Sequence, residues 1–158
     1  MNQIESVVVS GGFDPIHVGH LRMFKEASKL APKLIVIVNS DNFLIEKKGY
    51  VFMPIAERME IIEGFAVVDK VVESMDEDLT VCKTLQWLAR EENIKIFANG
   101  GDRNNTDSIP EADVCRENKI AMKFNVGGGK IQSSSSLVSN EIIKPWGSYK
   151  TFEKDKGF

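Results

Sequence analysis

Residues 7–20 read Val7-Val8-Val9-Ser10-Gly11-Gly12-Phe13-Asp14-Pro15-Ile16-His17-Val18-Gly19-His20, and they contain both histidines of the 158-residue chain. An apolar run comes first, a glycine-rich turn follows, and a helical pattern begins near Val18. A strand, a turn and a helix start in this order favour an anion site, because glycine lets the backbone approach the anion and the first amides of a helix have no partner within it. His17 and His20 are three residues apart at that helix start, so both imidazoles are expected to face the anion rather than to be two ordinary turn histidines.

Apolar runs rich in β-branched residues alternate with segments of helical periodicity along the rest of the chain. The expected strands are residues 4–10, 34–39, 67–73, 94–98 and 120–126, and the expected helices are residues 18–30, 54–63, 80–93, 110–118 and 134–143. Residues 41–52 are expected to form an exposed, mobile loop. This alternation predicts a single doubly wound, Rossmann-like α/β domain over residues 1–144, with a five-stranded, mostly parallel sheet flanked by helices, and a C-terminal tail over residues 145–158.

Composition and charge exclude several classes of function. A net charge of −3 gives no general electrostatic reason to bind nucleic acid or an anionic membrane. No apolar run approaches the length of a membrane span, and the first residues lack the basic region of a signal peptide. Cys82 and Cys115 fit no metal-binding spacing. These features predict a cytoplasmic protein, with no nucleic-acid or membrane partner, that binds phosphate through local groups.

Residues 12–21 resemble the HxGH loop of the nucleotidylyltransferase superfamily, which includes the cytidylyltransferases, the heptose-phosphate adenylyltransferases and phosphopantetheine adenylyltransferase. Further segments in the same order extend the resemblance over nearly the whole chain. It implies transfer of a nucleotidyl group from CTP or ATP to a phosphorylated sugar or polyol, with release of pyrophosphate. It also implies that His17 and His20 are catalytic and that the loop binds the nucleotide through Gly11, Gly12, Phe13, His17, Gly19 and His20, while Asp14 binds the acceptor substrate.

Lys47-Lys48-Gly49-Tyr50, followed by Pro54-Ile55-Ala56-Glu57-Arg58, resembles the family segment in which a loop lysine and a helix arginine touch phosphates. The resemblance implies catalytic roles for Lys47 and Arg58 and substrate binding by Lys48, although which lysine acts stays open. Guanidinium suits bidentate phosphate binding. The alternatives are a solvated lysine pair and a structural salt bridge from Arg58 to Glu57 or Glu60.

Two more loops follow expected strands, and the carboxyl ends of parallel strands are where such sheets bind ligands. Gly100-Gly101-Asp102 resembles the Gly-Asp element that the family places beside the nucleotide, which implies nucleotide contacts by Gly100 and Asp102 and a further anion contact by Arg103. An ordinary turn is the alternative.

Ser133-Ser134-Ser135-Ser136-Leu137-Val138 resembles the second motif of the superfamily, with the best match at Ser134, Ser135 and Ser136 as nucleotide contacts. Hydroxyls at a helix start can cap the helix or bind phosphate oxygens. A flexible serine linker is disfavoured because apolar periodicity resumes at Leu137. Cytidylyltransferases typically carry an arginine before this motif, whereas here Lys130 is the only cation, so ATP and CTP both stay open and Lys130 is assigned to the substrate.

The implied chemistry is in-line attack by the acceptor phosphate on the α-phosphorus. A phosphate oxygen is already a nucleophile at neutral pH, so alignment and charge stabilisation are needed rather than a general base. Mg²⁺ is expected to enter with the nucleoside triphosphate, and no residue is expected to be a dedicated metal ligand. The family resemblance also implies a homodimer. A phosphopantetheine-type adenylyltransferase and a non-catalytic nucleotide-binding module are the alternatives.

Overall fold

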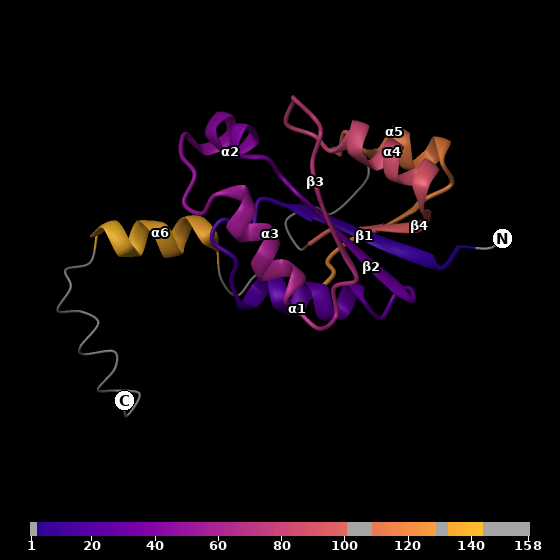
Figure 1. Cartoon of the computed structure of the whole chain (residues 1–158), viewed down its shortest axis with the longest axis horizontal. Coiled ribbons are helices and arrows are strands. Elements are labelled where there is room, and N and C mark those ends of the chain that lie inside the picture. Colours follow the sequence, from indigo (N-terminus) through magenta and orange to yellow (C-terminus); the bar gives the residue numbers. More distant parts are fainter. Residues whose placement is uncertain (1–2, 101–108, 129–132, 144–158) are drawn as a thin grey trace.

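The computed structural model describes residues 3–100, 109–128 and 133–143 as a three-layer α/β structure (Figure 1). Its central sheet has five strands in the order β3-β2-β1-β4-β5. Every neighbouring pair is parallel, which confirms the doubly wound prediction and makes the sheet fully rather than mostly parallel. The strands are β1 (Glu5–Gly11), β2 (Lys33–Val38), β3 (Lys70–Glu73), β4 (Asn93–Ala98) and β5 (Ala121–Lys123).

Helices cover both faces of this sheet (Figure 1). Helices α1 (Val18–Ala27) and α3 (Ile55–Glu63) pack on one face, and α4 (Cys82–Glu91) and α5 (Ala112–Glu117) pack on the other. The central strands are apolar on both sides because each face has its own core, with Val7 and Val9 in one and Val8 in the other. Two further helices, α2 (Asp41–Lys48) and α6 (Ser134–Ile143), lie at the carboxyl edge of the sheet.

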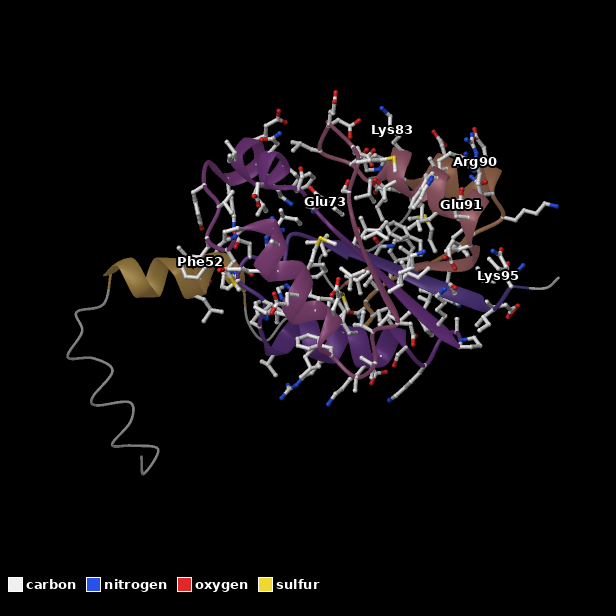
Figure 2. All side chains as sticks on the ribbon, viewed as in Figure 1. Phe52, Glu73, Lys83, Arg90, Glu91 and Lys95 are labelled. Atoms are coloured by element: carbon white, nitrogen blue, oxygen red, sulfur yellow. The ribbon has the colours of Figure 1, made fainter. Side chains whose placement is uncertain are left out.

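Helix α4 buries the apolar residues whose helical spacing predicted it. Leu85 and Leu88 are fully buried against the sheet. Lys83, Arg90 and Glu91 are exposed, and Lys83 points away from the domain in Figure 2. The helix therefore has the amphipathic pattern from which its existence was predicted.

The prediction of a loop over residues 41–52 is wrong for most of this segment, because residues 41–48 form helix α2. The Ser40 hydroxyl accepts a hydrogen bond from the amide of Phe43 at 3.2 Å, and Gly49 ends the helix with φ +86°. Only Leu44 is buried, so the helix has no apolar stripe that a periodicity search could find. Its caps, rather than a buried face, define its ends.

Three charged side chains tie the opposite, amino-terminal end of the sheet together. Glu92, just after α4, accepts hydrogen bonds from Lys33 of β2 at 2.9 Å and from Lys70 of β3 at 2.8 Å. Hydrogen bonds from Lys70 and then Lys33 hold the pKa of Glu92 below its ordinary value of 4.5. A carboxyl group with a lowered pKa stabilises the fold above its unfolded-state pKa, and the effect is lost as the pH falls through its folded-state pKa.

We therefore expect Glu92→Gln to lower the stability by about 1 kcal/mol at pH 7. Wild type and variant should converge as the pH falls below 4.5, the ordinary value of this carboxyl group, because the wild-type side chain then becomes neutral as well. Urea unfolding at several pH values measures the difference. A gap that stays constant through the acid range would contradict the ion-pair explanation.

The described helices include none that is long and apolar enough to cross a membrane. The expected tail, residues 145–158, lies outside the described residues.

Candidate active site

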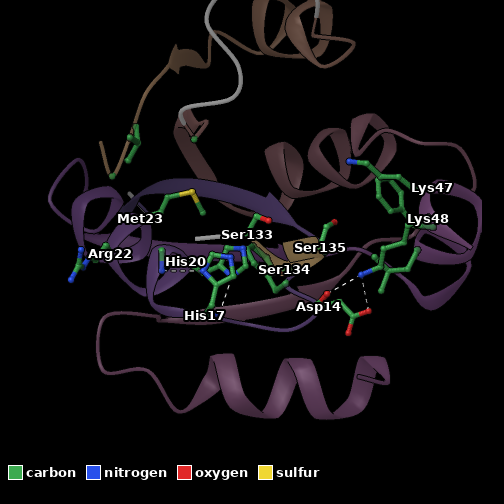
Figure 3. A pocket seen from close by; sticks show the side chains of 18 of the residues that line it. Asp14, His17, His20, Arg22, Met23, Lys47, Lys48, Ser133, Ser134 and Ser135 are labelled. Atoms are coloured by element: carbon green, nitrogen blue, oxygen red, sulfur yellow. Dashed lines mark hydrogen bonds and ion pairs between the residues drawn. The ribbon is translucent and has the colours of Figure 1, made fainter. Parts of the chain in front are cut away.

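A cavity of about 420 Å³ lies at the carboxyl edge of the sheet, where several loops meet (Figure 3). Its walls come from the β1–α1 loop, from α1 and α2, from the ends of β4 and β5, and from the start of α6. The predicted convergence of these loops is thus confirmed within the described residues. The predicted site residues that line the cavity are Gly12, Phe13, Asp14, His17, Gly19, His20, Lys47, Lys48, Gly100, Ser134 and Ser135.

The two histidines lie at the centre of the cavity wall with their rings stacked. Their centroids are 3.7 Å apart and their planes are inclined by 26°. The Nδ1 atom of His17 accepts a hydrogen bond from the amide of Gly19 at 3.0 Å, and the Nδ1 atom of His20 accepts one from the amide of His17 at 3.1 Å. An Nδ1 atom that accepts from an amide carries no proton, so the neutral ring has its proton on Nε2. The backbone therefore fixes both rings and makes Nε2–H their donor.

Phe13 links this pair to the hydrophobic core. Its ring stands edge-on to His20 at a centroid distance of 4.9 Å and to Phe24 at 5.3 Å. The backbone of Phe13 has φ +53°, a left-handed conformation that is unusual for an aromatic residue. A Cβ atom on Gly11 would lie 2.8 Å from the Phe13 ring. Gly11 is not among the residues that line the cavity, and its lack of a side chain leaves room for the Phe13 ring.

Asp14, the predicted acceptor contact, lies in the cavity wall within a network of protein groups. Its side chain is fully buried, and its two oxygens accept from the amides of Phe52 and Met53. Lys48 adds an ion pair to Oδ2 at 3.1 Å. Through these three partners, Asp14 connects the β1–α1 loop to the segment before α3.

Arg58, for which a phosphate contact was predicted, is fully buried and is not among the residues that line the cavity. Its guanidinium donates to the carbonyl oxygens of Met53, Gly12 and Asn39 at 2.7 to 2.8 Å and pairs with Asp41 at 2.6 Å. The salt-bridge alternative is nearer to the structure than phosphate contact, although the partner is Asp41 rather than Glu57 or Glu60. Arg58 holds the β1–α1 loop, the end of β2 and the start of α2 together.

The start of α6 closes one side of the cavity. The hydroxyl of Ser133 accepts from the amide of Ser136 at 3.0 Å and so acts as the helix cap. The hydroxyl of Ser134 donates to the carbonyl oxygen of Pro15 at 2.7 Å, which ties α6 to the β1–α1 loop. Ser133, Ser134 and Ser135 line the cavity whereas Ser136 does not. The predicted helix bounds, 134–143, are confirmed, and the prediction missed Ser133.

Several lining residues were not predicted. Met23 lies one helical turn after His20, a spacing that could have revealed it, and Gly127 packs against it so closely that a Cβ atom would lie 2.9 Å from the Met23 Cα atom. Arg22 adds an exposed cation that no sequence signal indicated. The complete set of missed residues is Arg22, Met23, Phe43, Leu44, Val126, Gly127, Gly128 and Ser133.

Three predicted contacts, Asp102, Arg103 and Lys130, lie outside the described residues. Within residues 3–100, 109–128 and 133–143, no group of three or more His, Cys, Asp or Glu side chains could hold a metal ion. Magnesium therefore stays a prediction tied to the nucleotide.

The chain is similar to known proteins over most of its length. The model of the family described as cytidylyltransferase-like matches residues 8–140. The chain is 35% identical to the bifunctional protein HldE of Streptomyces coelicolor over 71% of its own length and 23% of that protein. It is 33% identical to an FAD synthase of Thermococcus sibiricus over 71% of its own length and 73% of that enzyme.

Two further matches cover most of the chain. Identity to a probable ethanolamine-phosphate cytidylyltransferase of Encephalitozoon cuniculi is 27%, over 99% of this chain and 48% of that protein. The crystal structure of a lipopolysaccharide core biosynthesis protein from Thermoplasma volcanium superposes with a TM-score of 0.60 at 25% identity, covering 77% of this chain and 93% of that one. The chain thus spans less than half of the HldE protein and of the ethanolamine-phosphate enzyme that it matches.

Proposed function

The chain belongs to the cytidylyltransferase-like family, and from this membership and the cavity we propose that it is a nucleotidylyltransferase. The acceptor phosphate attacks the α-phosphorus of CTP or ATP, a new P–O bond forms, and the bond to the β-phosphate breaks to release pyrophosphate. The stacked histidine pair carries the proposal, because both Nδ1 atoms accept from backbone amides, which makes Nε2–H the donor of each ring, and both residues line the cavity. Two fixed donors side by side match the oxygens of one transferring phosphate group.

The other groups around the histidines supply positive potential. Arg22 and the lysines of α2 lie on opposite sides of the pair (Figure 3). The capped start of α6 adds helix amides and the partial positive charge of a helix N-terminus. Mg²⁺, when bound with the triphosphate, supplies further charge neutralisation, and phosphate oxygens would be its main ligands.

We propose a phosphorylated sugar or polyol as the acceptor, rather than a phosphate ester of an amino alcohol. Asp14 is the one acidic side chain among the described lining residues, and it is buried and already paired with Lys48. Two aromatic rings on the α2 side already face lysines, since Lys47 lies 5.6 Å from the Phe43 ring centroid and Lys48 lies 4.6 Å from that of Tyr50. The ammonium group of an amino-alcohol substrate would therefore be repelled by lysines on this side of the cavity, where it would need a carboxylate or an aromatic ring to bind it.

The test begins with thermal unfolding in Mg²⁺ with ATP, CTP, GTP or UTP. We expect ATP or CTP to raise the midpoint, because a ligand selective for the native state stabilises it by about 2.7 kcal/mol at a hundredfold excess over Kd. Pyrophosphate release is then measured with that nucleotide and each of three acceptor classes: sugar and polyol phosphates, phosphoethanolamine, and flavin mononucleotide.

Turnover with a sugar or polyol phosphate is the expected result. Preference for phosphoethanolamine would contradict the acceptor argument while preserving the reaction type. Turnover with flavin mononucleotide would place the chain functionally beside its FAD synthase relative. Nucleotide binding without turnover on any acceptor would favour the non-catalytic module. The expected homodimer stays a prediction, which analytical ultracentrifugation can test.

A further inference from the structure

We infer that Arg22 binds the pyrophosphate end of the nucleoside triphosphate, so that the reaction axis crosses the cavity from α2 to α1. The inference rests on the proposed function, because it requires a triphosphate at the histidine pair. It assigns one side of the cavity to each phosphorylated partner: the acceptor lies beside α2, and pyrophosphate leaves beside α1.

In-line displacement determines where the two reacting oxygens lie. The acceptor oxygen attacks the α-phosphorus from one side, and the oxygen that bridges to the β-phosphorus leaves on the other side with the electron pair of the broken bond. The nucleoside stays attached to the α-phosphorus between these two directions. With the α-phosphate at the histidine pair, the acceptor and pyrophosphate must therefore lie on opposite sides of that pair.

The cations in the cavity wall are divided in the same way. Arg22 lies on one side of the histidine pair, whereas Lys47 and Lys48 lie on the other (Figure 3). Among the described residues that line the cavity, Arg22 is the one lysine or arginine outside α2. Negative charge builds up on pyrophosphate as the bond to the α-phosphorus breaks, so a guanidinium on that side stabilises the transition state.

The Arg22 guanidinium has no ion-pair partner among the residues that the structure describes. Its side chain is exposed, and Glu26, one helical turn further along α1, pairs with Lys29 at 3.1 Å instead. Lys48 differs in this respect, because it already pairs with the buried Asp14 at 3.1 Å. Arg22 can therefore bind a phosphate without breaking an existing ion pair.

The linings of the two sides suit different ligands. On the α2 side, the ring of Phe43 provides an apolar surface for the carbon skeleton of a sugar or polyol. On the α1 side, Gly127 packs against Met23, the residue after Arg22, and is followed by Gly128 with φ +76°. A Cβ atom on Gly128 would meet no atom within 4 Å, so a phosphate can approach this backbone closely. The polyphosphate is therefore assigned to the α1 side.

Calorimetric titration of the full chain with inorganic pyrophosphate in Mg²⁺ tests the contact. Arg22→Ala should weaken binding of pyrophosphate, and of the magnesium nucleotide that wild type binds, by about 10- to 100-fold, the loss expected for one charged hydrogen-bonded contact. Arg22→Lys should recover only part of the affinity, because an ammonium group lacks the planar fork of donors. The thermal midpoint of ligand-free Arg22→Ala should stay within about 2 °C of wild type, since the side chain is exposed.

Lys25→Ala is the matched control, because it removes an exposed cation about one turn further along the same helix, outside the described cavity wall. This variant separates a direct contact from the general attraction between a basic helix and an anion. Equal losses of pyrophosphate affinity in Arg22→Ala and Lys25→Ala would overturn the inference, as would an unchanged affinity in Arg22→Ala.

Steady-state kinetics with an acceptor that turns over decide which side Arg22 serves. Arg22→Ala should lower kcat and weaken product inhibition by pyrophosphate, while KM for the acceptor changes by less than about twofold. Phe43→Ala should have the opposite effect, raising KM for the acceptor without weakening the binding of pyrophosphate. A rise in acceptor KM in Arg22→Ala as large as its loss of pyrophosphate affinity would overturn the assignment of sides.

Failure of this inference and failure of the proposed function give different results. If wild type binds neither pyrophosphate nor any of the four magnesium nucleotides, the proposed function fails, and the role of Arg22 fails with it. If wild type binds a nucleotide, and Arg22→Ala binds that nucleotide and pyrophosphate as tightly as wild type does, only the role of Arg22 is wrong.

Discussion

His17→Asn and His20→Asn are each expected to lower the rate of pyrophosphate release by about 10²- to 10³-fold, the usual effect of removing one donor to a transition-state oxygen. The asparagine side chain can place an acceptor oxygen near the position of Nδ1, but it is too short to replace Nε2–H. Because asparagine is among the best N-cap residues, His17→Asn should keep the helix cap that His17 gives to the amide of Gly19.

Binding and stability measurements show whether the lost rate is chemical. The thermal midpoint of His17→Asn should stay close to that of wild type, and the magnesium nucleotide should still raise it. A variant that keeps full turnover would contradict the proposed role of the histidine pair. A variant that unfolds at a much lower temperature would show instead that the imidazole is mainly structural.

Arg58→Ala is expected to cause the largest loss of stability, about 3–5 kcal/mol, which corresponds to a fall of roughly 10 °C in the thermal midpoint. The substitution empties the space of a fully buried side chain and removes the donors to Gly12, Asn39 and Met53, together with the partner of Asp41. Lysine cannot reproduce the fork of donors, so Arg58→Lys should recover only part of the loss.

Urea unfolding measures this effect, and Arg90→Ala on the exposed side of α4 (Figure 2) is the matched control with little expected change. Arg58→Lys keeps the test informative if the alanine variant does not fold. If Arg58→Ala has wild-type stability but has lost pyrophosphate binding, the phosphate contact expected from the sequence would be right and the structural role wrong.

The sheet and most helices could be predicted because burial leaves a pattern in the sequence. Buried strands such as β1 and β2 need apolar side chains on both faces, and α4 needs a stripe. The edge strands β3 and β5 are shorter than predicted, because apolar residues continue beyond the positions at which a neighbouring strand pairs with them. Helix α2 was missed because its boundaries depend on Ser40 and Gly49 and not on a stripe.

The candidate site was predictable to a lesser degree, because residue type alone does not show which partner a side chain finds. Asp14 and Arg58 have the right chemistry for ligand binding, yet both are buried among partners distant in sequence. Nothing in the sequence distinguishes Arg22 from other surface arginines, because only the position of α1 in the fold brings it to the cavity. The histidines were found because their spacing, the glycines and the helix start all lie within one short segment.

The contact between Phe13 and His20 gives the two sides of the cavity unequal freedom to change during evolution. On the histidine side, a substitution disturbs the packing of the Phe24 ring and of the close-packed interior behind it. On the α2 side, a cavity-lining position such as Phe43 can vary as long as the polar bonds of Asp14 and Arg58 remain. New acceptor preferences can therefore accumulate on α2 while the reaction itself is inherited unchanged, and a library for altered specificity belongs on that helix.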